Sequence, residues 1–333
     1  MTRTHIRLVS SLLGLGLGAF ALAATAAPQP AAAQGPVTIR IGSPFKPGHV
    51  LVDAAERFKA LVEERSSGRF TVAIDAGTKT EIDINKMTSA GTLEMQSNGT
   101  NFLELYAPRF YFFTGPYVMK DFDHFTRVWN GKLGQQARAE MEKAGNLKYL
   151  GTIYRGQRWT TTNRPVYTPA DVYQLKLRLP PIPSWMAVWK ALDADPVALP
   201  LTELYAGLKS GKAEASEGDL PQVASFKLDE VQTHLVMTNH LVQVGGMLIN
   251  KPFFERLPRG DRDLVVRAAD EACTWANERM KTGEIAYLLD LQRKGMKVVI
   301  PDAGLFRAKA RPAVEELFKT QWNVTTWENV LAQ

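Results

Sequence analysis

Residues 154–180 read YRGQRWTTTNRPVYTPADVYQLKLRLP, and the interpretation of the chain starts from this stretch. Two short runs in it, Arg158 to Asn163 and Leu175 to Leu179, alternate polar and apolar residues as β-strands do. A Pro-Ala-Asp turn separates the runs, so we expect two neighbouring strands that each carry one arginine. Arginine suits carboxylate binding, because its planar guanidinium meets both oxygens and stays charged. We therefore expect Arg158 and Arg178 to converge on one small anion.

The composition is that of an ordinary globular protein. The chain has 333 residues, of which 45% are hydrophobic and 22% are charged. This length allows two domains with cores of their own. The net charge is +6, but lysines and arginines are interleaved with acids along the chain. Because nucleic-acid-binding surfaces concentrate basic residues, we expect no nucleic-acid partner.

The N-terminus is typical of a secretory signal peptide, which we assign to residues 1–33. Arg3 and Arg7 precede the apolar run Leu8 to Ala24, and Ala31 to Ala33 fit a small-residue cleavage site. A transmembrane anchor is the alternative, but the run is rich in glycine and alanine and no stop-transfer charges follow it. We expect a mature protein that is exported to the periplasm.

No motif for catalysis or for a metal stands out in the chain. Cys273 is the single cysteine, so no intrachain disulfide can form. A catalytic thiol is one interpretation of Cys273, but its alanine-rich helical surroundings favour a small buried hydrophobic residue. The histidines lack zinc-site spacing, and neither a nucleophile elbow nor a phosphate-binding loop occurs. We expect no catalytic residue, no metal and no cofactor.

The order of strands and helices predicts an α/β fold. A strand at Val37–Gly42, a helix at Val50–Arg65 and a strand at Phe70–Ile74 make a βαβ unit, whose usual place is a covered parallel sheet. Long helices are predicted at Asp123–Ala144 and at Asp261–Lys294, the second with a possible kink at Gly283.

Two lobes, each a mixed sheet flanked by helices, are the simplest arrangement of these elements, with a long helix spanning the lobes. We expect the first lobe at residues 34–150 and about 244–300, the second at 151–243, and a C-terminal helical segment at 301–333. In open α/β sheets, ligands bind beyond the carboxyl ends of the strands, which makes Asn98 to Thr100 a candidate contact. A plain Asn-Gly turn is the alternative there.

Several motifs occur in a fixed order: RWTTTNRPV from Arg158, LKLRLP from Leu175, ALPLTELYAGLKSGKAEASEG from Ala198 and VMTNH from Val236. Together they resemble the periplasmic solute-binding subunits of TRAP transporters, the dicarboxylate-binding-protein family, over essentially the whole mature chain. The first motif is most similar to that of the sialic-acid-binding members. The resemblance implies a two-lobed, type II-like binding protein that closes on an organic acid. It also implies a partner, a sodium-driven permease with a small four-helix subunit and a large multi-span subunit.

The resemblance also assigns roles to single residues. Arg178 falls on the arginine that makes the two-point carboxylate contact, and Arg158 falls on a second contact. Further ligand contacts implied by position are Asn98, Thr100, Trp185 and Leu201.

The chain departs from the family pattern between Glu214 and Asp219. Many members read Asp-Gly-Gln-Glu-Asn-Pro here, with the asparagine facing the ligand, whereas this chain has Gly218 at that place. The departure implies a ligand other than sialic acid. Glu217 and Asp219 are candidates to bind its hydroxyl or amine groups, and capping of the following helix is the alternative for Asp219.

The kind of organic acid stays open at this point among keto acids, dicarboxylates, sugar acids and aromatic acids. A secreted α/β enzyme or a sensor subunit that acts on an acidic small molecule is the alternative function.

Overall fold

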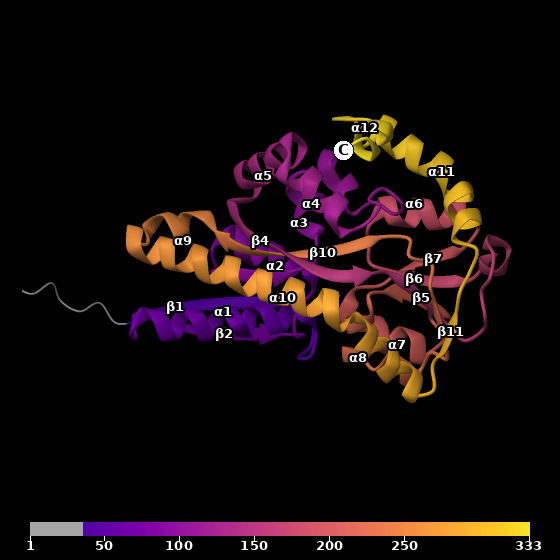
Figure 1. Ribbon diagram of the computed structural model, residues 1–333, viewed down its shortest axis with the longest axis horizontal. Helices are drawn as coiled ribbons and strands as arrows, with labels where there is room; N and C mark the ends of the chain where they lie inside the picture. The colour runs from indigo at the N-terminus through magenta and orange to yellow at the C-terminus, as the bar shows by residue number, and fades with distance from the viewer. Residues whose placement is uncertain (1–35) are drawn as a thin grey trace, which may run out of the picture. The chain divides into compact units, whose positions relative to one another are not determined.

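The computed structural model describes residues 36–333 and contains two β-sheets with helices packed on them (Figure 1). The strand order is β2-β1-β3-β10-β4 in the first sheet and β11-β9-β5-β8-β6-β7 in the second. Both sheets are mixed, since β10 runs antiparallel to β3 and β5 runs antiparallel to β8 while other pairs are parallel. The predicted α/β fold with two lobes is confirmed.

The first sheet is built from β1 (Val37–Ser43), β2 (Phe70–Ala76), β3 (Met95–Asn98), β4 (Leu147–Gln157) and β10 (Val242–Asn250). The second is built from β5 (Trp159–Thr162), β6 (Lys176–Leu179), β7 (Asp195–Ala198), β8 (Ala215–Gly218), β9 (His234–Val236) and β11 (Lys297–Val299). With the first sheet we group α1 (Val50–Ser66), α2 (Glu81–Ala90), α3 (Asn101–Tyr106), α4 (Phe122–Asn130), α5 (Lys132–Gly145) and α9 (Lys251–Arg256). With the second we group α6 (Pro183–Ala191), α7 (Leu204–Lys209) and α8 (Leu220–Ser225).

The predicted βαβ unit opens the first lobe. Parallel strands β1 and β2 are joined by α1, which buries Ala54, Phe58 and Leu61 at helical spacing. The imidazole of His49 caps α1, because its Nδ1 accepts the N–H of Leu51 at 3.2 Å. The capping bond holds the imidazole of His49 against the first turn of α1, which matters for the site described below.

Within residues 36–333 the chain passes three times from one sheet to the other: from β4 to β5, from β9 to β10, and through α10 (Arg259–Arg293) to β11. The first two passages meet, since the N–H of Arg158 donates to the carbonyl oxygen of Leu241 at 2.9 Å. Figure 1 shows β4 and β10 side by side as they approach the second sheet. Two hydrogen-bonded strands that change sheets at one point form a natural hinge.

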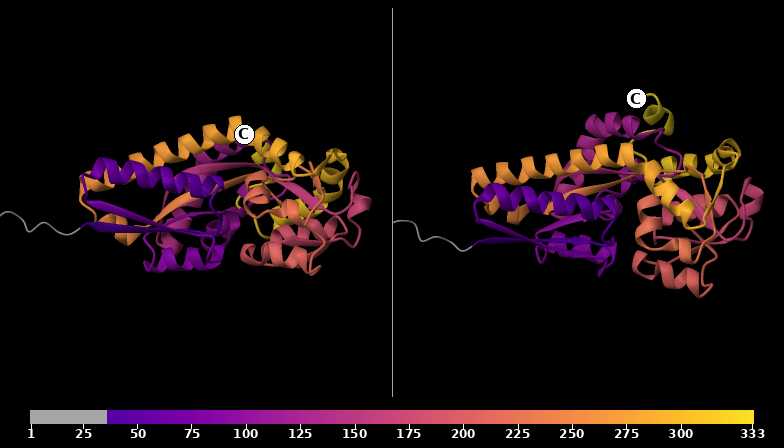
Figure 2. Two further views of the ribbon diagram at one scale, coloured as in Figure 1. Left: turned by 90° about the horizontal axis from the view of Figure 1, so that it is seen from below. Right: turned by 60° about the horizontal axis from the view of Figure 1, so that its bottom comes forward.

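The long helix α10 confirms the predicted element. It packs on α1 and β4 of the first lobe and also reaches α8 of the second (Figure 2). The helix runs without a break through Gly283, where we had expected a possible kink. After β11, α11 (Ala303–Thr320) packs on α6, and α12 (Trp327–Leu331) returns to the first lobe, where the ring Nε2 of His124 lies 2.9 Å from the carbonyl oxygen of Val330.

Three expectations need correction. The helix predicted over Asp123–Ala144 is two helices, because Gly131 is extended and the second helix starts beside the carbonyl of Trp129, where only a glycine fits at position 134. Strands β5 and β6 are not neighbours, since β8 lies between them.

The lobe boundaries also differ from the expected ones. Strand β4 stays in the first sheet to Gln157, although the first lobe was expected to end at residue 150. The segment of about 244–300, which was expected in the first lobe, ends in β11 of the second sheet. The chain thus contributes residues near 297–299 to the second lobe.

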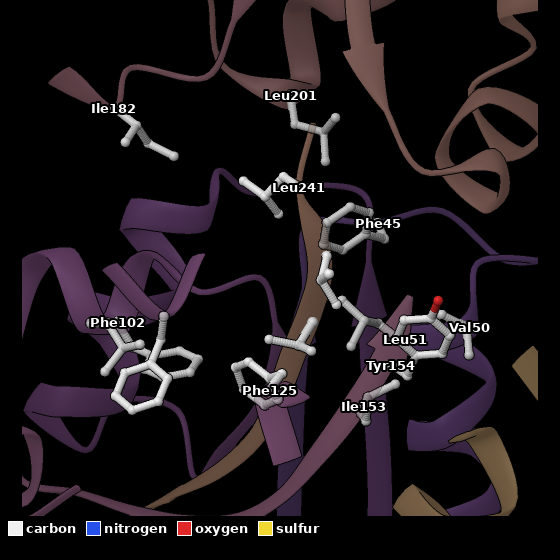
Figure 3. Packing of buried hydrophobic residues seen from close by; sticks show 14 of the residues in the cluster. Phe45, Val50, Leu51, Phe102, Phe125, Ile153, Tyr154, Ile182, Leu201 and Leu241 are labelled. Carbon is white, nitrogen blue, oxygen red and sulfur yellow. The ribbon is translucent and has the colours of Figure 1, made fainter. Parts of the chain in front are cut away.

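The apolar cores of the two lobes are continuous. Figure 3 shows buried members of this cluster, among them Phe45 and Leu51 of the first lobe and Leu201 of the second. None of the helices in residues 36–333 is long and apolar enough to cross a bilayer. The signal peptide assigned to residues 1–33 lies outside the described residues.

Candidate functional site

Arg178 projects from β6 and is 1% exposed. Its Nε–H donates to the carbonyl oxygen of Leu199 at 2.9 Å, whereas Nη2 has no hydrogen-bond partner and no carboxylate of residues 36–333 forms an ion pair with it. Burial lowers the pKa of Arg178 to about 10, although the charges of Glu217 and Glu81 oppose this shift. The guanidinium is therefore charged at neutral pH and lacks a counter-ion.

Arg178 borders a small cavity between the lobes. Its volume is about 20 Å³, close to the roughly 10–15 Å³ that one water molecule requires. The lining residues come from both lobes: Glu81, Thr100, Asn101, Arg155, Arg158, Arg178, Pro180, Ile182, Trp185, Leu201, Gln222 and Gln243. A larger solute can enter only if the lobes separate or the walls move apart.

Arg158 also lines the cavity, but it is already paired. Its Nη2 lies 2.6 Å from Oε1 of Glu217, and its Nε–H donates to Oε2 of the same carboxylate. This pairing is possible because β8, which carries Glu217, lies between β5, which directly follows Arg158, and β6, which carries Arg178. Arg158 is therefore not the unpaired arginine that the sequence predicted, and its contact with a ligand anion stays a prediction.

Glu217 has a further partner in His240, whose Nε2 lies 3.1 Å from Oε2 of Glu217. The other ring nitrogen of His240 lies 2.9 Å from Oγ1 of Thr238. Although burial opposes ionisation, Arg158 and His240 lower the pKa of Glu217 to about 2. Burial in turn lowers the pKa of His240. Glu217 thus serves as a fixed anion behind the cavity wall.

Arg155 is a third buried arginine at the cavity, and sequence reasoning missed it. Its Nη2 lies 2.6 Å from Oδ2 of Asp219, and its guanidinium carbon lies 4.3 Å from the ring centroid of Phe45. In a regular strand, residues three apart face opposite sides. Here the register of β4 shifts beside Gly156, which has φ +97°, and this bulge allows Arg155 and Arg158 to reach the same cavity.

Asp219 joins the two lobes. It follows β8 and caps α8, because its Oδ1 accepts the N–H of Gln222 at 2.9 Å. The same oxygen lies 3.2 Å from Nε2 of His49, in the first lobe. Burial lowers the pKa of His49 to about 4, which keeps the ring neutral at pH 7. Since Nδ1 of His49 accepts a backbone N–H, Nε2 carries the proton and donates to Asp219. Arg155 and His49 hold the pKa of Asp219 far below its usual range despite its burial.

Gly218 leaves space that Gln222 fills. A side chain at position 218 would collide with the amide of Gln222, which donates to the carbonyl oxygen of Glu217 at 3.2 Å and lines the cavity. An amide therefore stands at this part of the wall, supplied by the first turn of α8. In the sequence, Gln222, four residues after Gly218, is the residue that could have indicated this amide.

Trp185, Thr100 and Leu201 all line the cavity, as the resemblance implied. The indole N–H of Trp185, on α6, donates at 2.8 Å to the carbonyl oxygen of Thr114, which ends the 3-10 helix η1 (Pro108–Thr114) of the first lobe. The same indole lies under Arg158, with the guanidinium carbon 4.9 Å from the ring centroid. Trp185 thus forms part of the cavity wall and also links the lobes.

Asn98 lies outside the cavity lining. Its amide donates to Oε1 of Gln96 at 2.8 Å and to the backbone oxygen of Glu81 at 3.2 Å, which ties β3 to α2. The side chain of Glu81 reaches the cavity instead. Burial raises the pKa of Glu81, while Arg155 and Arg178 oppose the shift. Its carboxyl group can accept hydrogen bonds from ligand hydroxyl groups.

A larger hollow of about 420 Å³ lies on the first lobe along α4, β4 and α10. The partly buried amide of Asn277 in this hollow already has partners, because it accepts the N–H of Tyr154 at 2.6 Å and donates to the carbonyl oxygen of Thr152 at 3.1 Å. Cys273 borders this hollow and is 3% exposed, and burial raises the pKa of its thiol to about 12. Among residues 36–333, no group of three or more His, Cys, Asp and Glu side chains is arranged to hold a metal.

Two α/β lobes that enclose an unpaired buried cation beside a strand hinge define a solute-binding protein. The chain belongs to family 7 of the bacterial extracellular solute-binding proteins, the DctP family, whose model matches residues 41–321. This is the family of the TRAP solute-binding proteins, which are periplasmic and serve as receptors for TRAP permeases.

The chain is similar to proteins with different acidic ligands. It is 29% identical over 281 residues to the sialic acid-binding periplasmic protein SiaP of Vibrio cholerae, covering 84% of this chain and 88% of the relative. A TRAP periplasmic solute-binding protein from Roseobacter denitrificans with bound L-galactonate has 25% identity and a TM-score of 0.81, covering 88% of this chain and 98% of that chain. Another from the same organism, with bound 3-deoxy-D-manno-oct-2-ulosonic acid, has 26% identity and a TM-score of 0.81, covering 89% and 99%.

Proposed function

We propose that this chain is the periplasmic receptor of a TRAP transporter and that Arg178 binds the carboxylate of its solute. The observation that carries the proposal is the state of Arg178, which is buried, charged at neutral pH and without an ionic partner among residues 36–333. A buried charge without a partner is costly, so a carboxylate beside Arg178 stabilises the closed protein.

The hinge provides the binding cycle. When the lobes separate at the crossing near Arg158 and Leu241, the solute reaches Arg178, and closure then brings both walls against it. The closed form delivers the solute to a sodium-coupled permease made of a small and a large membrane subunit. Residues 1–33 direct the chain to the periplasm.

An acidic sugar derivative is the proposed ligand class. Sialic acid, L-galactonate and 3-deoxy-D-manno-oct-2-ulosonic acid each combine a carboxylate with several hydroxyl groups. The cavity offers matching groups, because Thr100, Asn101, Gln222 and Gln243 line it beside Arg178. These side chains can donate to hydroxyl oxygens and accept from hydroxyl hydrogens.

The test is a thermal-shift screen of aldonates, uronates, ulosonates and dicarboxylates on the mature chain, followed by calorimetric titration of each hit. A ligand that binds only the folded form raises the melting temperature. We expect Arg178→Ala to abolish measurable binding and Arg178→Lys to weaken it strongly, since lysine cannot make a two-point contact. Arg164→Ala, on the exposed surface of the same lobe, is the control and should bind as the parent does. Unchanged affinity in Arg178→Ala would contradict the proposal.

A further inference from the structure

The three buried arginines of the cavity differ in charge balance. Arg158 has Glu217 as its counter-ion within the second lobe, and Arg155 has Asp219 as its counter-ion. Of the three, Arg178 alone forms no ion pair within residues 36–333. The ion pairs therefore leave one guanidinium, that of Arg178, without a partner carboxylate, and this matches one carboxylate of a ligand.

Asp219 neutralises Arg155 from the opposite lobe. Arg155 lies on β4 of the first sheet, while Asp219 follows β8 of the second, and His49 of the first lobe holds the other carboxylate oxygen at 3.2 Å. Both contacts exist only while the lobes are together. Closure thus supplies Arg155 with its anion at the moment at which the solute is enclosed.

We propose that Asp219 is a specificity-determining residue: by neutralising Arg155 on closure, it restricts the site to solutes with a single carboxylate and selects against dicarboxylates. The inference rests on the proposed function, because it assumes that Arg178 receives the first carboxylate. A second carboxylate at the far end of a solute would meet an arginine whose charge is already balanced. It would also face the carboxyl group of Glu81, which lines the same cavity and has no ion-pair partner within residues 36–333. Like charges at close range disfavour such binding.

Hydroxyl groups of a ligand can still bind beside Arg155. Nε of Arg155 has no hydrogen-bond partner although the arginine is paired, so it is able to donate to a hydroxyl oxygen. Gln222 and Gln243 line the same cavity and add amide donors and acceptors. The wall near Arg155 therefore suits the hydroxylated end of a sugar acid better than a second anionic end.

The experiment compares L-galactonate with galactarate, which has the same carbon chain but carries a carboxylate in place of the terminal hydroxymethyl group. Calorimetric titrations use the mature parent, Asp219→Asn, Asp219→Ser and the double variant Arg155→Gln with Asp219→Asn. Asparagine and serine both retain helix-capping ability at position 219, which guards against loss of α8. Far-ultraviolet circular dichroism checks that each variant is folded.

The parent should prefer L-galactonate. In both single variants Arg155 loses its counter-ion, and the affinity ratio should shift toward galactarate by about tenfold or more. The double variant removes both charges and should return to a preference for the monocarboxylate. An unchanged ratio in the single variants, or a parent that prefers galactarate, would overturn the inference and leave the proposed carboxylate receptor intact. If neither these probes nor any acid of the wider screen binds the parent, the proposed function fails, and the inference fails with it.

Discussion

Arg158 and Glu217 form a two-point ion pair inside the second lobe, with Nη2 of the arginine 2.6 Å from Oε1 of the glutamate. Arg158 is 3% exposed and Glu217 is 1% exposed, so neither charge is hydrated. Removal of one partner from a buried pair leaves an uncompensated charge, which costs much more than the pair contributes. The pair is thus a structural part of the second lobe, and Arg178 is the arginine of the cavity that has no carboxylate partner within residues 36–333.

Glu217→Gln should lower the free energy of unfolding by about 3–5 kcal/mol, because it leaves the buried Arg158 without a counter-ion. Urea denaturation at pH 7 measures this change. Glu214→Gln on the exposed edge of the same segment is the matched control and should change stability by less than about 0.5 kcal/mol. Equal small effects for both substitutions would show that the pair is unimportant for folding.

His49 should make stability depend on pH between about 6.5 and 4. Burial lowers its pKa from 6.5 to about 4, so in this interval the unfolded chain binds a proton that the folded chain does not. Stability therefore falls as pH decreases. Between pH 7 and 5 the contribution amounts to about 2 kcal/mol.

The measurement is urea denaturation of the parent and of His49→Gln at pH 7 and at pH 5. We expect the parent to lose more stability than the variant across this interval. Burial and Lys297 also lower the pKa of His234 on β9, so His234→Gln should remove some of the pH effect, but less than His49→Gln removes. The same pH effect in His49→Gln and in the parent would mean that another group is responsible.

The sequence predicted the fold class and the position of Arg178 because both depend on local pattern. The alternation in LKLRLP predicts the strand that carries Arg178. The strand-helix-strand pattern of β1, α1 and β2 predicts the start of the first sheet. The order of strands could not be predicted, since β8 enters between β5 and β6 from a distant part of the chain. That insertion supplies the anion that pairs Arg158.

The place of Arg155 in the cavity could not be predicted from strand alternation, because Arg155 and Arg158 are three residues apart and a regular strand would turn them to opposite faces. The bulge at Gly156 changes which side of β4 faces the cavity, and it depends on pairing with β10, which lies far along the chain. The same holds for His49, because its partner Asp219 comes from the other lobe. Contacts between lobes leave no periodic signal in the sequence, so the interlobe ion pair appeared only with the structure.

The bulge leads to a prediction for Gly156→Ala. Gly156 has φ +97°, and a Cβ there would lie 2.6 Å from a carboxylate oxygen of Glu284. Alanine should therefore cost the roughly 1–2 kcal/mol expected for an unfavourable backbone conformation and, by displacing Glu284, also the hydrogen bond that its Oε1 accepts from the N–H of Gln157 at 3.2 Å. Gly211→Ala is the control, since φ is +75° there but no atom lies within 4 Å.

Thermal and urea unfolding measure the stability of Gly156→Ala and Gly211→Ala relative to the parent. We expect Gly156→Ala to lose more stability than Gly211→Ala and, in addition, to bind the solute more weakly, because the position of Arg155 depends on the bulge. Full ligand affinity in a folded Gly156→Ala protein would show that the bulge does not position Arg155.

Trp185→Phe should weaken solute binding without disturbing the fold. Phenylalanine keeps an aromatic ring under Arg158 but cannot donate the hydrogen bond that joins α6 to the carbonyl oxygen of Thr114 across the lobes. Since this bond joins the two lobes, its loss favours the open form and reduces affinity by about fivefold, as one net hydrogen bond is worth roughly 1 kcal/mol.

Calorimetry of the parent and of Trp185→Phe measures the loss, and stopped-flow fluorescence shows whether the dissociation rate rises, as expected for a less stable closed form. Trp275→Phe on the outer side of α10, where the indole is 36% exposed, is the control and should retain the affinity of the parent. The two variants separate closure from general stability, because both remove one indole but only one removes an interlobe bond. Equal affinities would mean that the hydrogen bond from Trp185 to Thr114 contributes nothing to closure.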